Sequence, residues 1–174
     1  QYKDVQEFIR HNSTNQIHSK KKSIKVVKPI ISSKKNERWH IDLLEMPMTL
    51  NKYRYILLVV DHFTKYLWAF PKTNKTNILN DMKDIILQHK PGIIQSDNGS
   101  EFKETNFNKF LEANNIKHIY SMPYNPQSNG AVERVVQTIK RMLYKYKTND
   151  GSISWNKILP DIIYNYNTSL HSTI

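Results

Sequence analysis

The sequence predicts an α/β domain built around a mixed five-stranded sheet with flanking helices. Three apolar, strand-like segments follow one another between residues 39 and 70, and helical and strand-like patterns then alternate up to the chain end. The length of 174 residues, with 39% hydrophobic side chains, suits one medium-sized domain that carries an appendage.

The first three strands form a predicted meander. Residues 39–44 alternate inward and outward side chains, as a strand with one buried face does. Residues 53–61 are apolar on both faces, which predicts a strand in the middle of the sheet. Residues 65–70 form a third strand, joined to the second by a short turn at 62–64.

The second half predicts helices on both sides of two short strands. Residues 76–89 carry apolar side chains at helical spacing after an Asn-rich segment, and Pro91-Gly92 ends this helix. The remaining predicted elements are a buried strand over 93–96, a helix marked by Phe107, Phe110 and Leu111, a fifth strand over 116–120, a long basic helix over 128–147 and a closing helix over 155–170.

Charge divides the chain into a basic arm and a nearly balanced domain. The whole sequence has 26 Lys and Arg against 15 Asp and Glu, a net charge of +11, which suits a polyanionic partner such as nucleic acid. Residues 1–36 hold nine basic and two acidic side chains, and residues 37–174 hold 17 and 13. We expect a short helix around residues 5–9, followed by an extended linker; a solvated lysine tether is the alternative for residues 20–35.

Several function classes are excluded by composition. The absence of cysteine excludes disulfides, thiol catalysis and cysteine-based zinc sites within this sequence. No apolar run approaches the roughly 20 residues that a bilayer requires, so we expect no membrane partner. The polar, basic start does not resemble a signal peptide, and an intracellular protein is expected.

Three acidic residues occupy positions where they can converge. Asp42 lies within the first strand, Asp97 directly follows the fourth, and Glu133 lies in the first turns of the long helix. Carboxylates brought together repel one another unless cations neutralise them, and Mg²⁺ or Mn²⁺ prefers such oxygen ligands. Two such ions, roughly 3.5–4 Å apart, suit phosphodiester chemistry. Taken singly, each carboxylate is more simply interpreted as a solvated surface group or a cap: Asp97 for the turn at Asn98-Gly99, and Glu133 for its helix.

Local sequence favours the catalytic interpretation. The stretches over residues 39–42 (Trp-His-Ile-Asp), 94–102 and 123–134 closely resemble the catalytic core of retroviral and long-terminal-repeat retrotransposon integrases, in the style of the gypsy-like branch. The signature of that DDE family of polynucleotidyl transferases is two Asp and one Glu, with 35 residues between the last two, as between Asp97 and Glu133 (133 − 97 − 1 = 35). The resemblance runs from about residue 37 to the chain end, where residues 166–173 resemble the family's closing helix.

The resemblance implies a ribonuclease-H-like fold and a function. That function is trimming of retroelement DNA ends and joining of their 3′ hydroxyls to target DNA. It uses Mg²⁺ or Mn²⁺, expected as two ions, held by Asp42, Asp97 and Glu133. We expect double-stranded DNA and further copies of the chain as partners, and action in the nucleus. The residues expected to contact DNA are Asn98, Tyr124, Gln127, Ser128, Arg134, Gln137, Lys140 and Arg141.

These DNA contacts have plainer alternatives. The loop over residues 124–130 is either a contact for a DNA end or a simple connector. Gln137 and Lys140 follow Glu133 by four and seven residues and so share its helix face, which is also compatible with a solvated flank. Two alternative functions stay open: a domesticated, non-catalytic descendant that binds DNA or protein, and a ribonuclease H or other nuclease on the same scaffold.

The N-terminal segment departs from the family pattern. Residues 5–16 match the end of the small His₂Cys₂ zinc module that precedes such cores, but Asn12 and Asn15 stand at the cysteine positions. Asparagine is a poor replacement for a thiolate at zinc. We therefore expect no zinc site, and we interpret residues 1–36 as the remnant of a degenerate module plus a basic linker, ahead of a catalytic core over 37–174.

Overall fold

The predicted mixed sheet is present in the structure. The computed structural model describes residues 31–121, 130–150 and 154–169; the expected N-terminal helix and zinc-module remnant lie outside these ranges. The strands pair in the order β3-β2-β1-β4-β5, with β1, β2 and β3 antiparallel and β1, β4 and β5 parallel. Their bounds are β1 Arg38–Glu45, β2 Tyr55–Asp61, β3 Leu67–Lys72, β4 Ile93–Ser96 and β5 Lys117–Tyr120.

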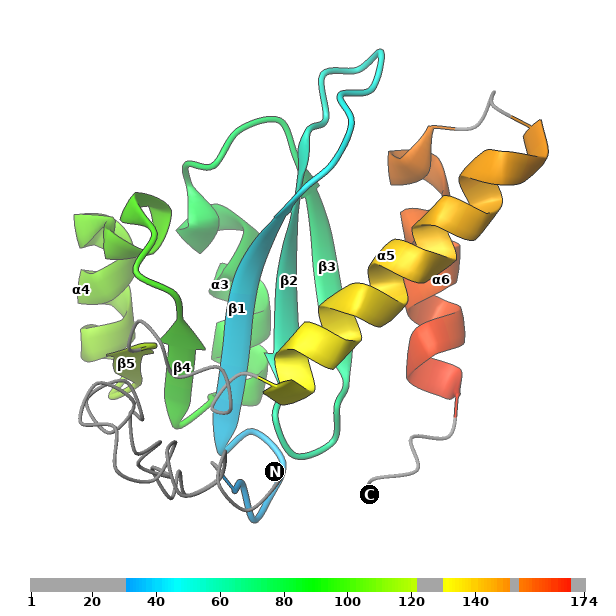
Figure 1. Ribbon diagram of the computed structural model, residues 1–174. Helices are drawn as coiled ribbons and strands as arrows, with labels where there is room; N and C mark the ends of the chain where they lie inside the picture. Colours follow the sequence, from blue (N-terminus) through cyan, green and yellow to red (C-terminus); the bar gives the residue numbers. More distant parts are fainter. Residues whose placement is uncertain (1–30, 122–129, 151–153, 170–174) are drawn as a thin grey trace, which may run out of the picture.

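Helices cover both faces of the sheet (Figure 1). The helices are α3 Ile78–His89, α4 Thr105–Ala113, α5 Gly130–Asp150 and α6 Trp155–Thr168, with a short 3₁₀ helix, η1 Ser100–Lys103, that the sequence pattern did not indicate. Within the described part of the chain, no helix is both long enough and apolar enough to cross a bilayer.

Two cores form because strand side chains alternate between the faces. Trp39 and Ile41 of β1 pack with α3 and α4, whereas Leu44 packs with α5 and α6 on the other face. Leu57 and Leu58 of β2 are both fully buried, one in each core, as expected of a central strand. Helices therefore cover both faces of β1. Any polar side chain of β1 on the same face as Leu44 lies beneath α5 and α6.

Strand β3 differs from the prediction at both ends. It was expected over residues 65–70 but begins at Leu67, because the turn is longer. The fully buried Asp61 accepts hydrogen bonds from the Thr64 amide (3.1 Å) and hydroxyl (2.6 Å), and Lys65 has a φ of 62°. That left-handed conformation does not belong to a strand. The buried carboxylate thus organises the turn and delays the strand.

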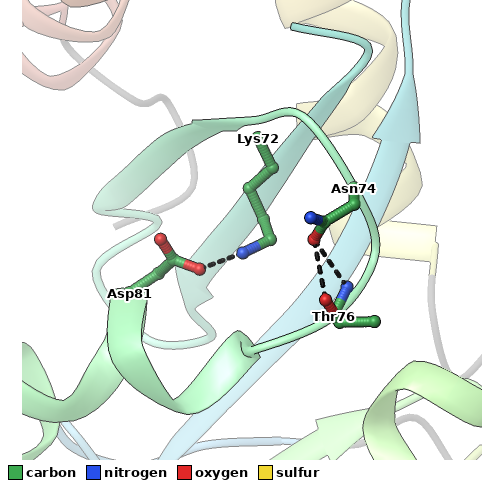
Figure 2. A network of polar contacts seen from close by, with 4 residues as sticks. All are labelled: Lys72, Asn74, Thr76 and Asp81. Carbon is green, nitrogen blue, oxygen red and sulfur yellow. Dashed lines mark hydrogen bonds and ion pairs between the residues drawn. The ribbon is translucent and has the colours of Figure 1, made fainter.

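The connection between β3 and α3 is held by polar contacts (Figure 2). The Lys72 ammonium, 8% exposed, forms an ion pair with Asp81 in the first turn of α3. Asn74 accepts hydrogen bonds from the Thr76 amide (3.1 Å) and hydroxyl (2.8 Å). These contacts form a turn over residues 74–76, so α3 begins at Ile78 rather than at the expected residue 76.

Candidate active site

Asp42 is placed beneath α5 by the alternation of β1. It shares its face of the strand with His40 and Leu44, and it is half-buried. In the adjoining parallel strand, the register pairs Arg38 with Ile93 and His40 with Gln95. Continuing this register by two residues brings Asp97, just past the end of β4, to the position beside Asp42.

Asp97 is held in a tight turn. Its Oδ1 accepts a hydrogen bond of 2.9 Å from the Gly99 amide, so the cap suggested as the plain alternative exists. A Cβ on Gly99 would lie 2.7 Å from the carboxyl group of Glu101 and 3.0 Å from Asp97 Oδ1. A larger residue here would require the Glu101 side chain to move away from this position.

The three predicted carboxylates line one groove, of about 370 Å³, between the sheet and α5. Asp42 comes from β1, Asp97 from the end of β4 and Glu133 from the first turn of α5. The other lining residues are His40, Ile41, Val136, Gln137 and Lys140. The sequence reasoning placed the carboxylates in one cleft, and the structure brings them to one groove.

Electrostatics within the groove disfavour the charged form of Asp42. Burial raises the pKa of Asp42, and the nearby Asp97 and Glu101 carboxylates raise it further, while a backbone hydrogen bond from Leu43 and the Lys140 ammonium oppose the shift. A group with this pKa shift is stabilised in its ionised form by an added cation. The groove therefore has the electrostatic character of a cation site.

The sequence did not indicate two residues that lie at or near this groove. Glu101 lies close enough to raise the pKa of Asp42, and His40 lines the groove with an exposed fraction of 4%. Burial lowers the pKa of His40 to about 4, and Nδ1 of this ring has no partner among the described residues. The period of two along β1 was the available signal for His40, since it precedes Asp42 by two residues.

Seven of the eight expected DNA contacts divide into three groups. Gln137 and Lys140 line the groove with the carboxylates, as their helical spacing indicated. Arg134 and Arg141 are exposed on α5 but do not line it. Tyr124, Gln127 and Ser128 lie outside the described residues.

Asn98 makes an internal contact. Its side-chain amide donates to the Ser121 carbonyl oxygen at 2.9 Å. The Ser121 amide donates to the Ser96 carbonyl oxygen at 2.8 Å, and Gln95 Nε2 donates to the Ser121 hydroxyl at 3.0 Å. Arg38 in turn donates to Gln95 Oε1 at 2.8 Å. The last described residue after β5 is thereby tied to the strand that precedes Asp97, and DNA binding by Asn98 stays a prediction.

The donor set suits a hard divalent cation. Carboxylate oxygens are the ligands that Mg²⁺ and Mn²⁺ prefer, and Asp42 is electrostatically prepared for a cation. Among the residues that the structure describes, however, no three His, Asp or Glu side chains are already gathered as ligands of one ion. Asp42, Asp97 and Glu133 therefore line one groove without forming a preformed ligand cluster.

Comparison with known proteins identifies the family of this chain. Residues 32–126, more than half of the chain, match the family model described as integrase core domain. The chain belongs to this family. The integrase family includes relatives from viruses and from transposons, and the resemblance to integrase catalytic cores of the DDE type is thereby confirmed.

Two curated relatives illustrate the range of the family. The chain is 33% identical over 131 residues to the Gag-Pol polyprotein of Avian reticuloendotheliosis virus, which covers 73% of this chain and 11% of the polyprotein. It is also 33% identical over 120 residues to the retrovirus-related Pol polyprotein from transposon RE2 of Arabidopsis thaliana, covering 65% of this chain and 8% of that protein. The chain thus spans about a tenth of the length of these relatives.

Solved structures of integrases share the fold. An intasome of simian T-cell lymphotropic virus, in complex with the PP2A regulatory subunit B56 gamma, aligns with a TM-score of 0.69 at 25% identity, over 79% of this chain and 51% of that one. The HTLV-2 integrase catalytic core domain with magnesium, in a dimeric form, aligns with a TM-score of 0.65 at 25% identity, over 80% and 92%. The expected ribonuclease-H-like fold is confirmed.

Proposed function

We propose that this chain is the catalytic core of an integrase that trims retroelement DNA ends and joins their 3′ hydroxyls to target DNA. The observation that carries the proposal is the common groove lined by Asp42, Asp97 and Glu133. These carboxylates come from three separate elements, and their separation along the sequence follows the signature of the family. A non-catalytic descendant has no need to keep all three in one groove.

The groove residues have two proposed roles: some hold cations and others hold DNA. Asp42, Asp97 and Glu133 would hold two Mg²⁺ or Mn²⁺ ions, which, when bound, supply an activated oxygen nucleophile and stabilise the leaving oxygen. The Lys140 ammonium supplies positive charge for a phosphate at the same groove, and the Gln137 amide supplies a hydrogen-bond donor and acceptor. The apolar side chains of Val136 and Ile41 also line the groove.

The proposed partners are double-stranded DNA and further copies of this chain. A net charge of +11 favours association with a polyanion, and the HTLV-2 core has been described in dimeric and trimeric forms. Joining two DNA ends to one target requires two active sites, which supports a homodimer or a higher multimer. Action on chromosomal DNA places the proposed activity in the nucleus.

The deciding experiment is a strand-transfer assay. The protein is incubated with Mn²⁺ and a labelled blunt duplex, with Glu133→Gln as the matched inactive control. Products longer than the substrate, absent in the control, support the proposal. Failure to form any product favours the non-catalytic descendant, and cleavage restricted to RNA–DNA hybrids favours a ribonuclease H.

A further inference from the structure

A second basic feature lies away from the carboxylate groove. A hollow of about 520 Å³ is lined by residues that include Lys34, Lys35, Glu37, His89, Lys90 and Gly92. We call this feature the lysine hollow. It brings together lysines from two turns that are more than 50 residues apart in sequence: the turn before β1 and the turn between α3 and β4. Its composition therefore comes from tertiary structure and is not a run in the sequence.

The two turns are docked against each other by backbone contacts. The Gly92 amide donates to the Asn36 carbonyl oxygen at 2.9 Å, and Asn36 and Lys90 both have left-handed backbones, with φ of 60° and 47°. A Cβ on Gly92 would lie 3.2 Å from the Glu37 carbonyl oxygen, a close approach that glycine permits. The relative positions of the lysine-bearing turns are thus set by the fold.

One carboxylate, that of Glu37, opposes the charge of the three lysines of the hollow. Ion pairs hold Arg54 to Glu45 and Lys72 to Asp81, whereas no ion pair between described residues involves Lys34, Lys35 or Lys90. Glu37 is the carboxylate at the hollow, and its Oε2 already accepts hydrogen bonds from the Ser33 amide and hydroxyl and from the Lys34 amide. Three ammonium groups against one carboxylate leave a net charge of +2 at the hollow (3 − 1 = 2).

We infer that the lysine hollow binds the phosphodiester backbone of duplex DNA as a contact separate from the carboxylate groove. Lysine ammonium groups act as point charges toward phosphates and do not read base edges, so the contact is independent of sequence. Lys34 and Lys35 also belong to the segment over residues 1–36, which holds nine of the 26 basic side chains of the sequence. This inference deepens the proposed function, since it names a second place at which the same DNA-joining protein holds its substrate.

The hollow and the groove are spaced along the same two strands. Gly92 directly precedes β4, whereas Asp97 directly follows it. Arg38, at the start of β1, is four residues from Asp42, which corresponds to about 13 Å along a strand. We therefore expect removal of the lysines to leave the carboxylates and their surroundings unchanged.

The test compares two triple variants of the full chain. Lys34→Ala/Lys35→Ala/Lys90→Ala removes the hollow charge, and Lys83→Ala/Lys109→Ala/Lys157→Ala removes three exposed lysines of α3, α4 and α6. Each lowers the net charge equally, from +11 to +8 (11 − 3 = 8). Binding of a 30-base-pair duplex of arbitrary sequence is followed by fluorescence anisotropy between 50 and 300 mM salt, without divalent cations, and thermal melting checks that both variants fold.

We expect the hollow variant to lose affinity about tenfold or more at 0.1 M salt and its log–log salt slope to flatten by two to three, since each phosphate contact contributes about 0.9. The control variant should stay within about threefold of wild type, and Lys34→Arg/Lys35→Arg/Lys90→Arg should retain binding. Equal losses in the two alanine variants would overturn the inference, because net charge alone would then explain binding. So would loss of binding to polyglutamate, but not to DNA, in the hollow variant, because the partner would then be an acidic protein.

The strand-transfer assay keeps this inference distinct from the proposed function. If the wild-type protein joins DNA and the two alanine variants bind DNA equally, the proposed function stands and the inferred DNA contact at the lysine hollow is rejected. If the wild-type protein does not join DNA but the hollow variant selectively loses DNA binding, the lysine hollow stands as a DNA contact and the proposed joining activity is rejected.

Discussion

Asp42 is the groove carboxylate whose ionised form the fold disfavours, because burial and neighbouring carboxylates raise its pKa. An acid with a raised folded-state pKa destabilises the fold as pH rises through that pKa. Asp42→Asn removes this effect, so we expect a higher melting temperature at pH 7 without metal, and a smaller increase on adding Mg²⁺ than in wild type. Calorimetry measures both, and a metal-dependent increase that survives the substitution would separate Asp42 from the cation site.

The same substitution should abolish DNA joining. Loss of residues that merely orient metal ligands costs about 10- to 100-fold, so loss of a ligand should cost more than about 100-fold. We expect this of Asp42→Asn, Asp97→Asn and Glu133→Gln, each with the fold retained. A Glu133→Gln protein within threefold of wild type in strand transfer would show that the metal assignment is wrong.

Asn98 tests whether a residue beside Asp97 binds DNA or positions the backbone. Its amide donates to the Ser121 carbonyl oxygen, so Asn98→Ala should lower the free energy of unfolding by about 0.5–1.5 kcal/mol and reduce joining. The exposed Asn106 of α4 offers the control variant Asn106→Ala. Positioning predicts reduced joining with unchanged duplex affinity, whereas weakened affinity at unchanged stability would identify a DNA contact.

At the scale of elements, the ion pair between β3 and α3 should stabilise their connection. Asp81→Asn leaves the buried Lys72 ammonium without its carboxylate, which should cost about 1–3 kcal/mol of unfolding free energy. The exposed pair between Arg54 and Glu45 provides the control, since Glu45→Gln should cost less than about 1 kcal/mol. Urea denaturation compares the two, and equal costs would contradict the dependence on burial.

His118 makes the packing of β5 against α4 dependent on pH. Its ring contacts Asn108 Oδ1 at 2.6 Å and the Ser96 hydroxyl at 3.0 Å, and burial lowers its pKa from 6.5 to about 4. The unfolded chain therefore binds a proton more readily between pH 6.5 and about 4. This contribution to stability is complete above pH 6.5 and is lost as pH falls toward about 4. We expect His118→Gln to show a smaller fall in melting temperature between pH 7 and pH 5, and an unchanged fall would exclude His118 as a source.

At the scale of the whole molecule, self-association should involve the edge of the sheet. An open apolar hollow of about 510 Å³ lies between β3 and α6, lined by residues that include Pro71, Leu159, Ile163 and the 70% exposed Tyr164. If a second copy covers this surface, Tyr164→Asp should shift low-micromolar protein toward monomer in sedimentation, because it places a charge in an apolar interface. Tyr144→Asp on α5 is the control, and equal sedimentation of the two variants would move the interface elsewhere.

Local sequence predicted the elements that have a strong period. The two-sided apolar pattern of residues 53–61 indicated the buried centre of the sheet, and apolar spacing over 76–89 indicated α3 within two residues of its start. Predicted element boundaries were wrong where a hydrogen bond to a side chain fixes a turn that the apolar pattern does not indicate. The buried Asp61 holds a longer turn before β3, and η1 follows a turn closed by the Asp97 carboxylate. Both contacts join residues two or three positions apart, but the spacing of apolar residues does not indicate them.

The sequence by itself determined the strand and helix patterns, the basic charge and the positions of Asp42, Asp97 and Glu133 along the chain, because these depend on side-chain type and spacing. Only the tertiary structure decided that the three carboxylates line one groove, that His40 and Glu101 accompany them, that Asn98 bonds to Ser121 and that Lys90 joins Lys34 and Lys35. The physical reason is that these neighbours are brought together by the parallel pairing of β1 with β4 and by the packing of α5 on the sheet. Both depend on burial of apolar surface between residues distant in sequence.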